Sequence, residues 1–533
     1  MKRLRFILLS IIFFILGLTL ILYFNEKIDG KALTEAHTNI MFTWFVVYSI
    51  AFMVIAYFFM NKKLPDKINP AIVLSVSLFL ILVLKIYISF VTKGFTVDTG
   101  CFCGWSNSAG ENLFDFYTKS WSDYPPLYIA ILSFCGKLTS IFGIPQLIAI
   151  RIPSLLAEIG ISLLIYRIST KNFTKTAGLF LAIAFALNPL VLFDNAIWGQ
   201  MDVVLAFFIV LAIYLLQKNK FVFASILFAS AILIKPQAIF FLPLLIFALI
   251  KNKKILPFIY SGLTGIATVF LIVLPFNKFQ FQILTKGTES PIVKFEYATS
   301  KIIEIVNGAL PFLKSFTAVA FNLPVFREFI WLGDLFLRTA SGYPYISSNA
   351  ANTYFLFNKN TTEDSLYAIK ALGINFSTLG LIFVGLIIIF GGIVYLRGKH
   401  NSIPWFTGVF LNVGIFMLAT RMHERYMFTV VALIIIAYIY SKDLFTPVLL
   451  LLFTLTNYIN IDYVFTKFVM INYPWINGDS RVILFVSFLN VIGLAALTAF
   501  LMGLAFKNYL PINKVSIPKA LTRTAIRAKN KRK

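Results

Sequence analysis

Residues 97–126 read VDTGCFCGWSNSAGENLFDFYTKSWSDYPP and lie between long apolar runs. The segment places Asp98 and Asp123, with two further carboxylates, among Phe, Tyr and Trp side chains. Carboxylates among aromatic residues suit a site that binds the faces of sugars and accepts a proton from a hydroxyl group. Taken alone, the segment is better interpreted as an amphipathic loop lying on a membrane, where Trp and Tyr are favoured. The rest of the chain instead favours the interpretation of this segment as part of a sugar-binding site.

The composition predicts an all-α polytopic membrane protein. The chain has 533 residues, of which 59% are hydrophobic and 13% charged, and its mean hydropathy is +0.85. Repeated uncharged runs of about 20 residues are typical of membrane-spanning helices. The net charge of +25 comes from short Lys and Arg blocks between these runs and from the tail at 507–533. This distribution is typical of cytoplasmic loops near anionic lipids, so it argues against a nucleic-acid partner.

The positive-inside rule predicts about 14 crossings with both termini in the cytoplasm. The expected spans are 6–24, 41–60, 71–91, 151–168, 177–192, 203–216, two halves of 221–250, 255–275, 371–396, 405–418, 426–440, 447–458 and 482–506. The run 127–141 is short and is expected to be an interfacial helix on the outer face. Residues 460–479 are expected to form an outer loop.

The run 221–250 is long enough for one helix, but Lys235-Pro236 interrupts its centre. A single crossing would place the basic residues 251–254 outside. Two short crossings with the turn at Lys235–Gln237 keep those residues inside, so the sequence favours a hairpin.

Four regions follow from this topology. Residues 1–70 form an N-terminal transmembrane hairpin, and residues 71–440 form a core with large outer loops at 92–150 and 276–370. Residues 441–506 form the C-terminal helices, and 507–533 a basic cytoplasmic tail. The three cysteines are too few for a disulfide framework and are expected to be free thiols.

Five polar motifs interrupt the apolar background, and the topology places all of them on the outer side. They are Asp98 with DYPP at 123–126, WGQMD at 198–202, KPQ at 235–237, YPYISSNAAN at 343–352 and RMHERY at 421–426. Because charged groups at membrane depth are costly, such a convergence predicts a functional site.

Asp98 and Asp123 are the two candidates for a general base that accepts a proton from an acceptor hydroxyl. Asp98 is favoured because it directly follows a helix and its position is better fixed. Without such a role, Asp98 would be a charge in the headgroup region, and the DYPP prolines would only end one helix and begin the next.

Further side chains of these motifs are candidates for substrate binding. Trp198 could stack on a sugar or lie in the membrane interface, and Asp202 could cap the returning helix as well as act in the site. The full set of substrate-binding candidates is Trp105, Tyr124, Asp194, Trp198, Gln200, Asp202, Gln237, Tyr345, Asn349 and Glu424.

Lys235, His423, Arg425 and Arg421 are cations on the side where the positive-inside rule predicts few. A lipid phosphate would explain them, since Arg can bind phosphate through two hydrogen bonds. Alternatively, Glu424 pairs with Lys235 or Arg425. The sequence has no phosphate-binding glycine loop, zinc spacing or Ser-His-Asp signature, so the energy for any group transfer has to come with the substrate.

Together these motifs resemble the membrane-embedded GT-C glycosyltransferases, in particular the bacterial and archaeal relatives of the enzyme that adds the second mannose to GPI anchors. The resemblance runs from about residue 91 to 440. It is carried by Asp98 and by DYPPLY at 123–128, RIPSLLAE at 151–158, NPLVLFDNAIWGQMD at 188–202, IKPQA at 234–238, YPYISSNAAN at 343–352 and MHERY at 422–426.

The resemblance implies a GT-C-type fold and an inverting transfer of a sugar, usually mannose, from a polyprenyl-phosphate donor to a lipid, glycan or protein acceptor. It implies Asp98 as the base and Lys235, His423 and Arg425 as ligands of the donor phosphate. No metal is required, although the carboxylates could hold a divalent ion. The implied location is a prokaryotic plasma membrane with the active site facing outside.

Two other classes compete with this reading. A transporter or flippase of a lipid-linked or anionic substrate would also carry ionisable residues within the membrane, but is expected to show inverted repeats and broken helices in matching halves, which the sequence does not indicate. A scaffolding membrane protein would leave Lys235 and the HERY motif unexplained.

Overall fold

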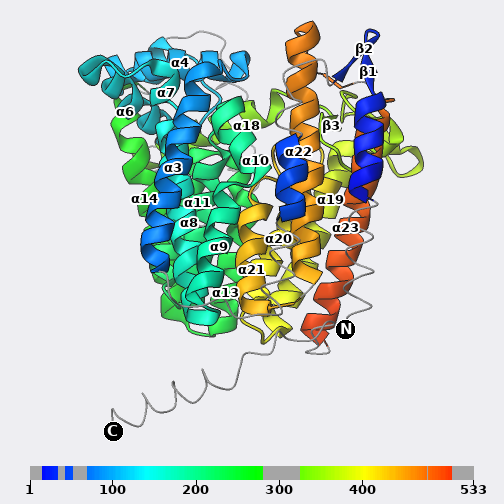
Figure 1. Ribbon diagram of the computed structural model, residues 1–533. Helices are drawn as coiled ribbons and strands as arrows, with labels where there is room; N and C mark the ends of the chain where they lie inside the picture. Colours follow the sequence, from blue (N-terminus) through cyan, green and yellow to red (C-terminus); the bar gives the residue numbers. More distant parts are fainter. Residues whose placement is uncertain are drawn as a thin grey trace.

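A computed structural model describes residues 15–33, 43–51, 69–279, 324–443, 445–473, 475–476 and 478–506. Parts of the first two expected spans (6–14, 41–42 and 52–60) and the basic tail therefore lie outside the described residues. Within them the protein is a bundle of helices with three two-stranded pairings (Figure 1).

The first half of the bundle is built from helices interrupted by short loops. Its elements are α3 (Pro70–Val91), α4 (Thr96–Glu111), α5 (Phe116–Lys119), α6 (Pro126–Phe142), α7 (Gln146–Ala149), α8 (Ile152–Asn172), α9 (Lys175–Ala186), α10 (Pro189–Leu192), the π-helix η2 (Phe193–Trp198), α11 (Asp202–Gln217), α12 (Phe221–Ile234), the 3₁₀-helix η3 (Pro236–Phe241), α13 (Leu242–Asn252), α14 (Ile255–Val273) and η4 (Leu274–Phe279).

The second half adds six helices and a folded connector (residues 342–375). The helices are α18 (Pro324–Ser341), α19 (Phe376–Arg397), α20 (Ile403–Leu418), α21 (Val430–Ser441), α22 (Phe445–Ile471) and α23 (Arg481–Phe506), with α18 lying before the connector. The connector holds β3 (Ser347–Ser348), η6 (Phe355–Phe357), β4 (Tyr367–Ile369), η7 (Lys370–Leu372) and β5 (Ile374–Asn375). Strand β3 pairs in parallel with β6 (Met422–His423), while β4 pairs with β5 and β1 (Lys27–Ile28) with β2 (Lys31–Ala32).

Local sequence signals explain where several helices begin. The side chains of Asn69, Thr174 and Asn375 accept hydrogen bonds from the backbone N–H groups of Ala71, Ala177 and Thr378. Such caps satisfy donors that have no partner inside the helix. Proline also stands in the first turn of α3, α6 and α8, where its missing N–H costs nothing.

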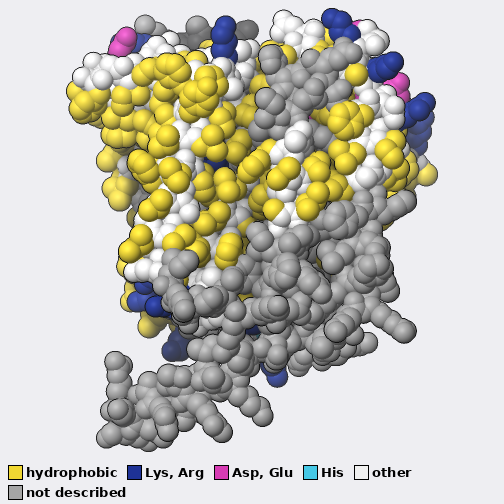
Figure 2. Space-filling view, viewed as in Figure 1, with side chains coloured by type: hydrophobic (Ala, Val, Ile, Leu, Met, Phe, Trp, Pro, Cys, Tyr) yellow, Lys and Arg dark blue, Asp and Glu magenta, His cyan; other side chains and the backbone are white. Residues whose placement is uncertain are grey.

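The helices identify an integral multi-pass membrane protein. Among the described residues, 6 helices are long and apolar enough to cross a membrane, or up to 7 if the bent pair formed by α9 and Pro189–Trp198 is one span. Seven shorter apolar helices accompany them, so the predicted total of 14 crossings is not established. Hydrophobic side chains cover much of the visible flank of the bundle in Figure 2.

The hairpin predicted over 221–250 is confirmed. Gln217, at the end of α11, donates to the carbonyl of Asn401, and Lys251, at the end of α13, donates to the carbonyls of Tyr395 and Gly398. The start of α12 and the end of α13 therefore lie at the same end of the bundle. Lys235 lies at the turn between them, as its Pro236 neighbour predicts.

One boundary was predicted wrongly. Helix α22 continues to Ile471, where the sequence predicted a span ending at 458 and an outer loop from 460. The polar residues that indicated a loop have partners inside the bundle. Asn460 donates to the carbonyl of Asn349 and accepts from the N–H of Ala351, and Tyr23 donates to Asp462 at 2.5 Å. Because these side chains are hydrogen-bonded within the bundle, the helix does not end at them.

Two helices are broken at polar positions: the break at Lys235-Pro236 was predicted, whereas the sequence predicted one unbroken span over 177–192. Helix α9 and the segment Pro189–Trp198 meet at 46°, and η2 is a π-helix, whose wider turn bends the chain. Helix α12 ends at Ile234 before Lys235-Pro236. Both breaks lead directly into predicted site motifs.

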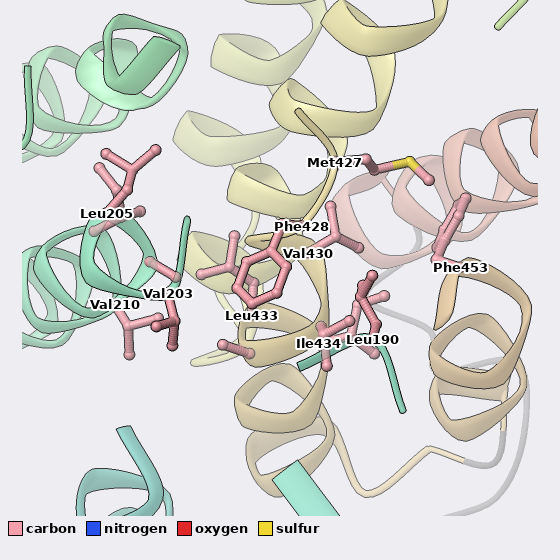
Figure 3. Packing of buried hydrophobic residues seen from close by; sticks show 14 of the residues in the cluster. Leu190, Val203, Leu205, Val210, Met427, Phe428, Val430, Leu433, Ile434 and Phe453 are labelled. Carbon is pink, nitrogen blue, oxygen red and sulfur yellow. The ribbon is translucent and has the colours of Figure 1, made fainter. Parts of the chain in front are cut away.

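The apolar core lies directly beside these motifs. Figure 3 shows Val203 of α11 and Leu190 of α10 packed near Phe428 and Leu433 from the region of α21. Val203 follows Asp202, and Phe428 lies three residues after Arg425. Close packing allows such side chains little movement, so the core holds the charged residues next to them in fixed positions.

Candidate active site

A cluster of polar side chains surrounds Asp98. Its other members are Trp198, Gln200, Asp202, Lys235, Glu424 and Arg425. Asp98 lies in the first turn of α4, and its Oδ2 accepts hydrogen bonds from Trp198 Nε1 at 2.7 Å and from Gln200 Nε2 at 2.6 Å. Oδ1 has no hydrogen-bond partner among the described residues, and the side chain keeps 23% of its surface exposed. One oxygen is therefore fixed while the other remains available to a ligand.

A tight backbone approach brings Trp198 to Asp98. The N–H of Phe95 donates to the Trp198 carbonyl at 2.9 Å, and the two rings stack with centroids 4.5 Å apart. Gly199 follows with φ of +88°, and a Cβ there would lie 2.8 Å from Thr99 Cγ2. Only glycine adopts this conformation without strain and leaves room for α4, so the Gly199 turn is a local requirement of the site.

The carboxylate of Asp202 and the ammonium of Lys235 form a buried ion pair. Their Oδ1 and Nζ atoms are 2.5 Å apart, and the Asp202 and Lys235 side chains are 1% and 7% exposed. Gln237 Nε2 lies 3.4 Å from the same oxygen. Asp202 is the first residue of α11, and its Oδ1 accepts from Lys235 and Gln237 while its Oδ2 has no hydrogen-bond partner among the described residues, so its carboxylate serves the cluster rather than the helix end.

Arg425 joins the three carboxylates of the cluster. Its Nη1 lies 2.7 Å from Glu424 Oε1 and 3.5 Å from Asp98 Oδ2, and its Nε lies 3.7 Å from Asp202 Oδ2. The guanidinium also lies over the Trp198 ring, 4.7 Å from the centroid. Of the two pairings left open for Glu424, the structure has the one with Arg425, while Lys235 pairs with Asp202.

Burial and charge set the ionisation of this group. Burial lowers the pKa of Arg425, but the carboxylates of Glu424, Asp98 and Asp202 outweigh it and raise the pKa overall, so the guanidinium stays charged. Burial raises the pKa of Glu424, opposed by Arg425. Both cations keep spare donors: Arg425 Nη2 has no partner among the described residues, and Lys235 has three N–H groups but bonds only Asp202.

Asp123 lies near Asp98 and is half-buried, as Asp98 is. Burial raises the pKa of its carboxyl, its own backbone N–H lowers it, and the Asp98 charge raises it further. Its carbonyl accepts a hydrogen bond from Thr339 Oγ1 of α18 at 2.8 Å. The neighbouring ring of Tyr124 packs against Trp105 with centroids 5.6 Å apart. Asp123 and Tyr124 thus border the cluster, and Trp105 packs against the Tyr124 ring.

His423 lies beside the cluster as a neutral group. Burial, with the charges of Arg425 and Lys235, lowers the pKa of its imidazole to about 3. Its ring contacts Tyr343 edge-on at 4.9 Å and Tyr426 at 5.2 Å. The prediction that His423 adds a positive charge is therefore corrected: at neutral pH it can offer a hydrogen bond, because nearby cations and burial disfavour its protonation.

Arg421, Tyr345 and Asn349 serve the connector that borders the site. Arg421 Nε lies 2.6 Å from Asp364 Oδ2, and its Nη1 donates to the Ala340 carbonyl. Tyr345 packs on Trp475, and its carbonyl accepts from the Arg421 N–H.

Asn349 bonds within the connector and to α22. Its Oδ1 accepts from Asn360 Nδ2 and from the Ile476 N–H, and its carbonyl accepts from Asn460. The structure gives Asn349, Tyr345 and Arg421 these partners instead of bringing them to Asp98.

Asp194 lies beneath the cluster, fully buried on η2. Its carbonyl accepts from the N–H groups of Gly199 and Gln200 at 3.0 and 2.9 Å, which closes the turn that presents Trp198. Neither carboxylate oxygen has a hydrogen-bond partner in the described part of the chain.

Two further residues that shape this site, Arg151 and Tyr343, open the motifs RIPSLLAE and YPYISSNAAN but were not among the predicted site residues. Arg151 is fully buried and donates to the carbonyls of Ser89, Leu147 and Thr92, which fixes the loop that leads to Asp98. An arginine inside an apolar run is a signal that could have found it. The Tyr343 ring contacts the His423 ring, and its place at the start of YPYISSNAAN is the signal that could have found it.

No group of three or more His, Cys, Asp or Glu side chains suited to a metal ion occurs among the described residues. Cys101, Cys103 and Cys135 are free thiols, as predicted.

Residues 123–277 match the family model of the dolichyl-phosphate-mannose-protein mannosyltransferases. This range holds Asp123, Asp202 and Lys235, but neither Asp98 nor Arg425, and it covers less than a third of the chain. The protein resembles a GT-C membrane glycosyltransferase. The match supports a mannosyltransferase-type glycosyltransferase in general. No curated protein matches the chain.

Proposed function

We propose that the protein transfers a sugar, with mannose the expected one, from a polyprenyl-phosphate donor to an acceptor hydroxyl on the outer face of a prokaryotic plasma membrane. The acceptor is a lipid, a glycan or a protein. The observation that carries the proposal is the Asp98 carboxylate, with Oδ2 held by Trp198 and Gln200 and Oδ1 left without a partner. A base has to be fixed in position and yet accessible to the proton that it accepts.

The cations beside Asp98 suit the donor phosphate. Arg425 and Lys235 have N–H groups left over after their ion pairs, so a phosphate oxygen can bind them while Glu424 and Asp202 stay in place. His423, neutral at this position, can add a hydrogen bond. The positive charge stabilises the leaving phosphate as the bond to the sugar breaks.

The proposed chemistry is a single displacement. The acceptor oxygen attacks the anomeric carbon from the face opposite the phosphate, and the bond between that carbon and the phosphate oxygen breaks. The electron pair of that bond leaves with the polyprenyl phosphate, and the acceptor proton passes to Asp98 Oδ1. The anomeric configuration is therefore inverted. No step is assigned to a metal ion.

Asp123 is the second candidate for the base. Its carboxyl lies in the same electrostatic environment, but burial and the Asp98 charge hold its pKa above the usual range. A carboxyl that retains its proton more strongly is ionised in a smaller fraction at a given pH. Asp98 therefore remains the preferred base.

A transporter or flippase is the alternative, and one observation favours it. The broken pair α9 and Pro189–Trp198 and the break between α12 and η3 both lead into the charged cluster, as discontinuous helices do in transporters. Both breaks also lie within 123–277, the range that matches the mannosyltransferase family. The transferase accounts for that match and the transporter does not.

The test is transfer of radiolabelled mannose from polyprenyl-phosphate mannose by purified protein in lipid nanodiscs supplied with a lipid extract of its host. Asp98→Asn is compared with Asp115→Asn, because Asp115 lies in the same segment but pairs only at the surface with Lys119 and Asn112. We expect a labelled product with the native protein and with Asp115→Asn, and loss of product with Asp98→Asn.

The mass and anomeric configuration of the product identify the acceptor and check the inversion. Retention of the anomeric configuration would contradict the single displacement. Absence of product with every polyprenyl donor, together with movement of labelled lipid across the bilayer, would replace the transferase with the flippase.

A further inference from the structure

A second buried ion pair lies outside the catalytic cluster. Lys85 of α3 and Glu158 of α8 have their Nζ and Oε2 atoms 2.5 Å apart, and the two side chains are 1% and 4% exposed. Lys85 is the only charged residue of α3, whose side chains are mostly apolar and many of them exposed on the flank of the bundle. Burying two charges costs desolvation energy that their attraction often does not recover, so stability alone is a weak reason for this pair.

Glu158 also contacts the π-helix that leads to Trp198. Its Oε2 accepts a hydrogen bond from Asn195 Nδ2 at 2.7 Å, and Asn195 lies in η2. Ser154, four residues earlier on α8, donates to the Gln200 carbonyl at 2.9 Å. Residues four apart share one face of a helix, so this face of α8 holds the chain on both sides of the Trp198 turn.

The segment between these two anchors carries both donors that hold Asp98. The carbonyl of Asp194, just before this segment, accepts from the N–H groups of Gly199 and Gln200, and the Trp198 and Gln200 side chains then reach Asp98 Oδ2. A π-helix is intrinsically less stable than an α-helix and needs external contacts to persist. The Glu158–Asn195 bond is such a contact, from a side chain that is itself held by Lys85.

We propose that Glu158, held by Lys85, is a positioning residue for the transfer reaction. Its hydrogen bond to Asn195 keeps η2 in the π-helical form, and η2 in turn aligns Trp198 and Gln200 on Asp98. The kinetic part of this inference rests on the proposed function, and the structural part does not. The acceptor oxygen on residue 158 carries the role, while the two charges serve to hold that oxygen in place.

Two double variants separate the oxygen from the charge. Lys85→Met with Glu158→Gln removes both charges and keeps an oxygen that can accept from Asn195. Lys85→Met with Glu158→Leu removes both charges and the oxygen. Neither variant leaves a buried charge without its partner, so both are expected to fold. Ser162→Ala, on the buried side of the same helix, is the control for mutation of α8 as such.

Hydrogen exchange provides a readout that needs no activity. We expect the amides of Gly199 and Gln200 to exchange faster in the Leu double variant than in the Gln double variant, because their acceptor, the Asp194 carbonyl, lies on η2. Asn195→Ala, which leaves the Lys85–Glu158 pair intact, should show the same faster exchange. Ser162→Ala should exchange as the native protein does.

Kinetics provide the second readout. In the Leu double variant we expect kcat to fall by about tenfold to about 100-fold, since a displacement of 1 Å at a catalytic group can cost about 100-fold. The donor KM should stay within about twofold, because the phosphate ligands are not altered. The Gln double variant should recover most of the lost kcat.

Equal exchange at Gly199 and Gln200 in the two double variants would overturn the inference, whatever the activity. Equal loss of kcat in both would assign the role to the charges instead of the oxygen and would also overturn it. If the native protein transfers no sugar from any donor while exchange differs as expected, the proposed function fails and the positioning of η2 by Glu158 stands.

Discussion

The indole Nε1 of Trp198 donates to Asp98 Oδ2 at 2.7 Å, although the two residues are 100 positions apart in the chain. This bond joins the first turn of α4 to the end of the π-helix η2. It leaves Oδ1 of the same carboxylate exposed to whatever enters the site. The bond thus separates two tasks of one side chain, with one oxygen fixing the position and the other available for chemistry.

The two candidate bases can be distinguished by a matched pair of variants. Asp98→Asn should reduce kcat by about 10²- to 10⁴-fold, the range that general-base catalysis contributes, while its amide oxygen still accepts from Trp198. Asp123→Asn should reduce kcat much less, because Asp123 borders the cluster and has no bond to Trp198 or Gln200. The measurement is kcat for sugar transfer, with thermal unfolding confirming that both variants fold.

A larger loss in Asp123→Asn than in Asp98→Asn would move the base to Asp123. Asp98 would then be only the acceptor that holds Trp198 and Gln200 in place.

The sequence predicted the cluster in part. Asp98, Asp202, Lys235 and Arg425 each stand in a polar motif next to an apolar run, and the structure brings these motifs together. Which cation pairs with which carboxylate could not be read from the motifs, because the pairing depends on how α11, η3 and the 421–426 turn approach one another. Hydropathy likewise could not show that α22 continues past Tyr458, since Asn460 and Asp462 find their partners only in the folded bundle.

Removal of Lys235 should destabilise the protein through Asp202. Lys235→Met leaves the Asp202 carboxylate buried without its closest cation, a change that costs about 3–5 kcal/mol in the free energy of unfolding. Lys235→Met combined with Asp202→Asn should recover much of that stability, because no uncompensated charge remains. Chemical denaturation measures both.

Donor affinity separates the structural role of Lys235 from its proposed role in binding. If Lys235 binds the donor phosphate, the double variant should remain weak in donor binding after its stability has recovered. Recovery of both properties together would make the Lys235–Asp202 pair a purely structural one.

Gly199 offers a test of the tight approach to α4. Gly199→Ala places a side chain at φ of +88° and a Cβ 2.8 Å from Thr99 Cγ2. Gly143→Ala is the matched control, since its φ is +67° and nothing lies within 4 Å of its Cβ. Both variants should lose about 1–2 kcal/mol of stability from the left-handed conformation. Only Gly199→Ala should also reduce kcat, because only there must Trp198 or α4 move. Equal kcat in the two variants would contradict this account.

The neutral state of His423 makes a prediction about pH. Because burial and the charges of Arg425 and Lys235 lower the pKa of His423 to about 3, this residue does not titrate between pH 6 and 8. Any change in donor affinity over that range should therefore persist in His423→Gln. Isothermal titration of both proteins with the donor at several pH values provides the measurement. A pH dependence that disappears in His423→Gln would show that the imidazole becomes charged when the phosphate binds.

Asp123 makes the opposite kind of pH prediction, for stability. Burial holds the pKa of its carboxyl above that of an unfolded aspartate, with the Asp98 charge adding to the effect. A carboxyl whose pKa is raised by folding favours the folded state below the pKa of the unfolded chain, and this contribution is lost as the pH rises through the raised pKa.

Asp123→Asn removes the titration but keeps a neutral side chain of the same size. The Tm of Asp123→Asn minus that of the native protein should therefore be small near pH 4 and increase with pH, then become constant above the raised pKa. A difference that stays constant from pH 4 to 8 would mean that folding does not raise the pKa of Asp123, and would remove this argument against Asp123 as the base.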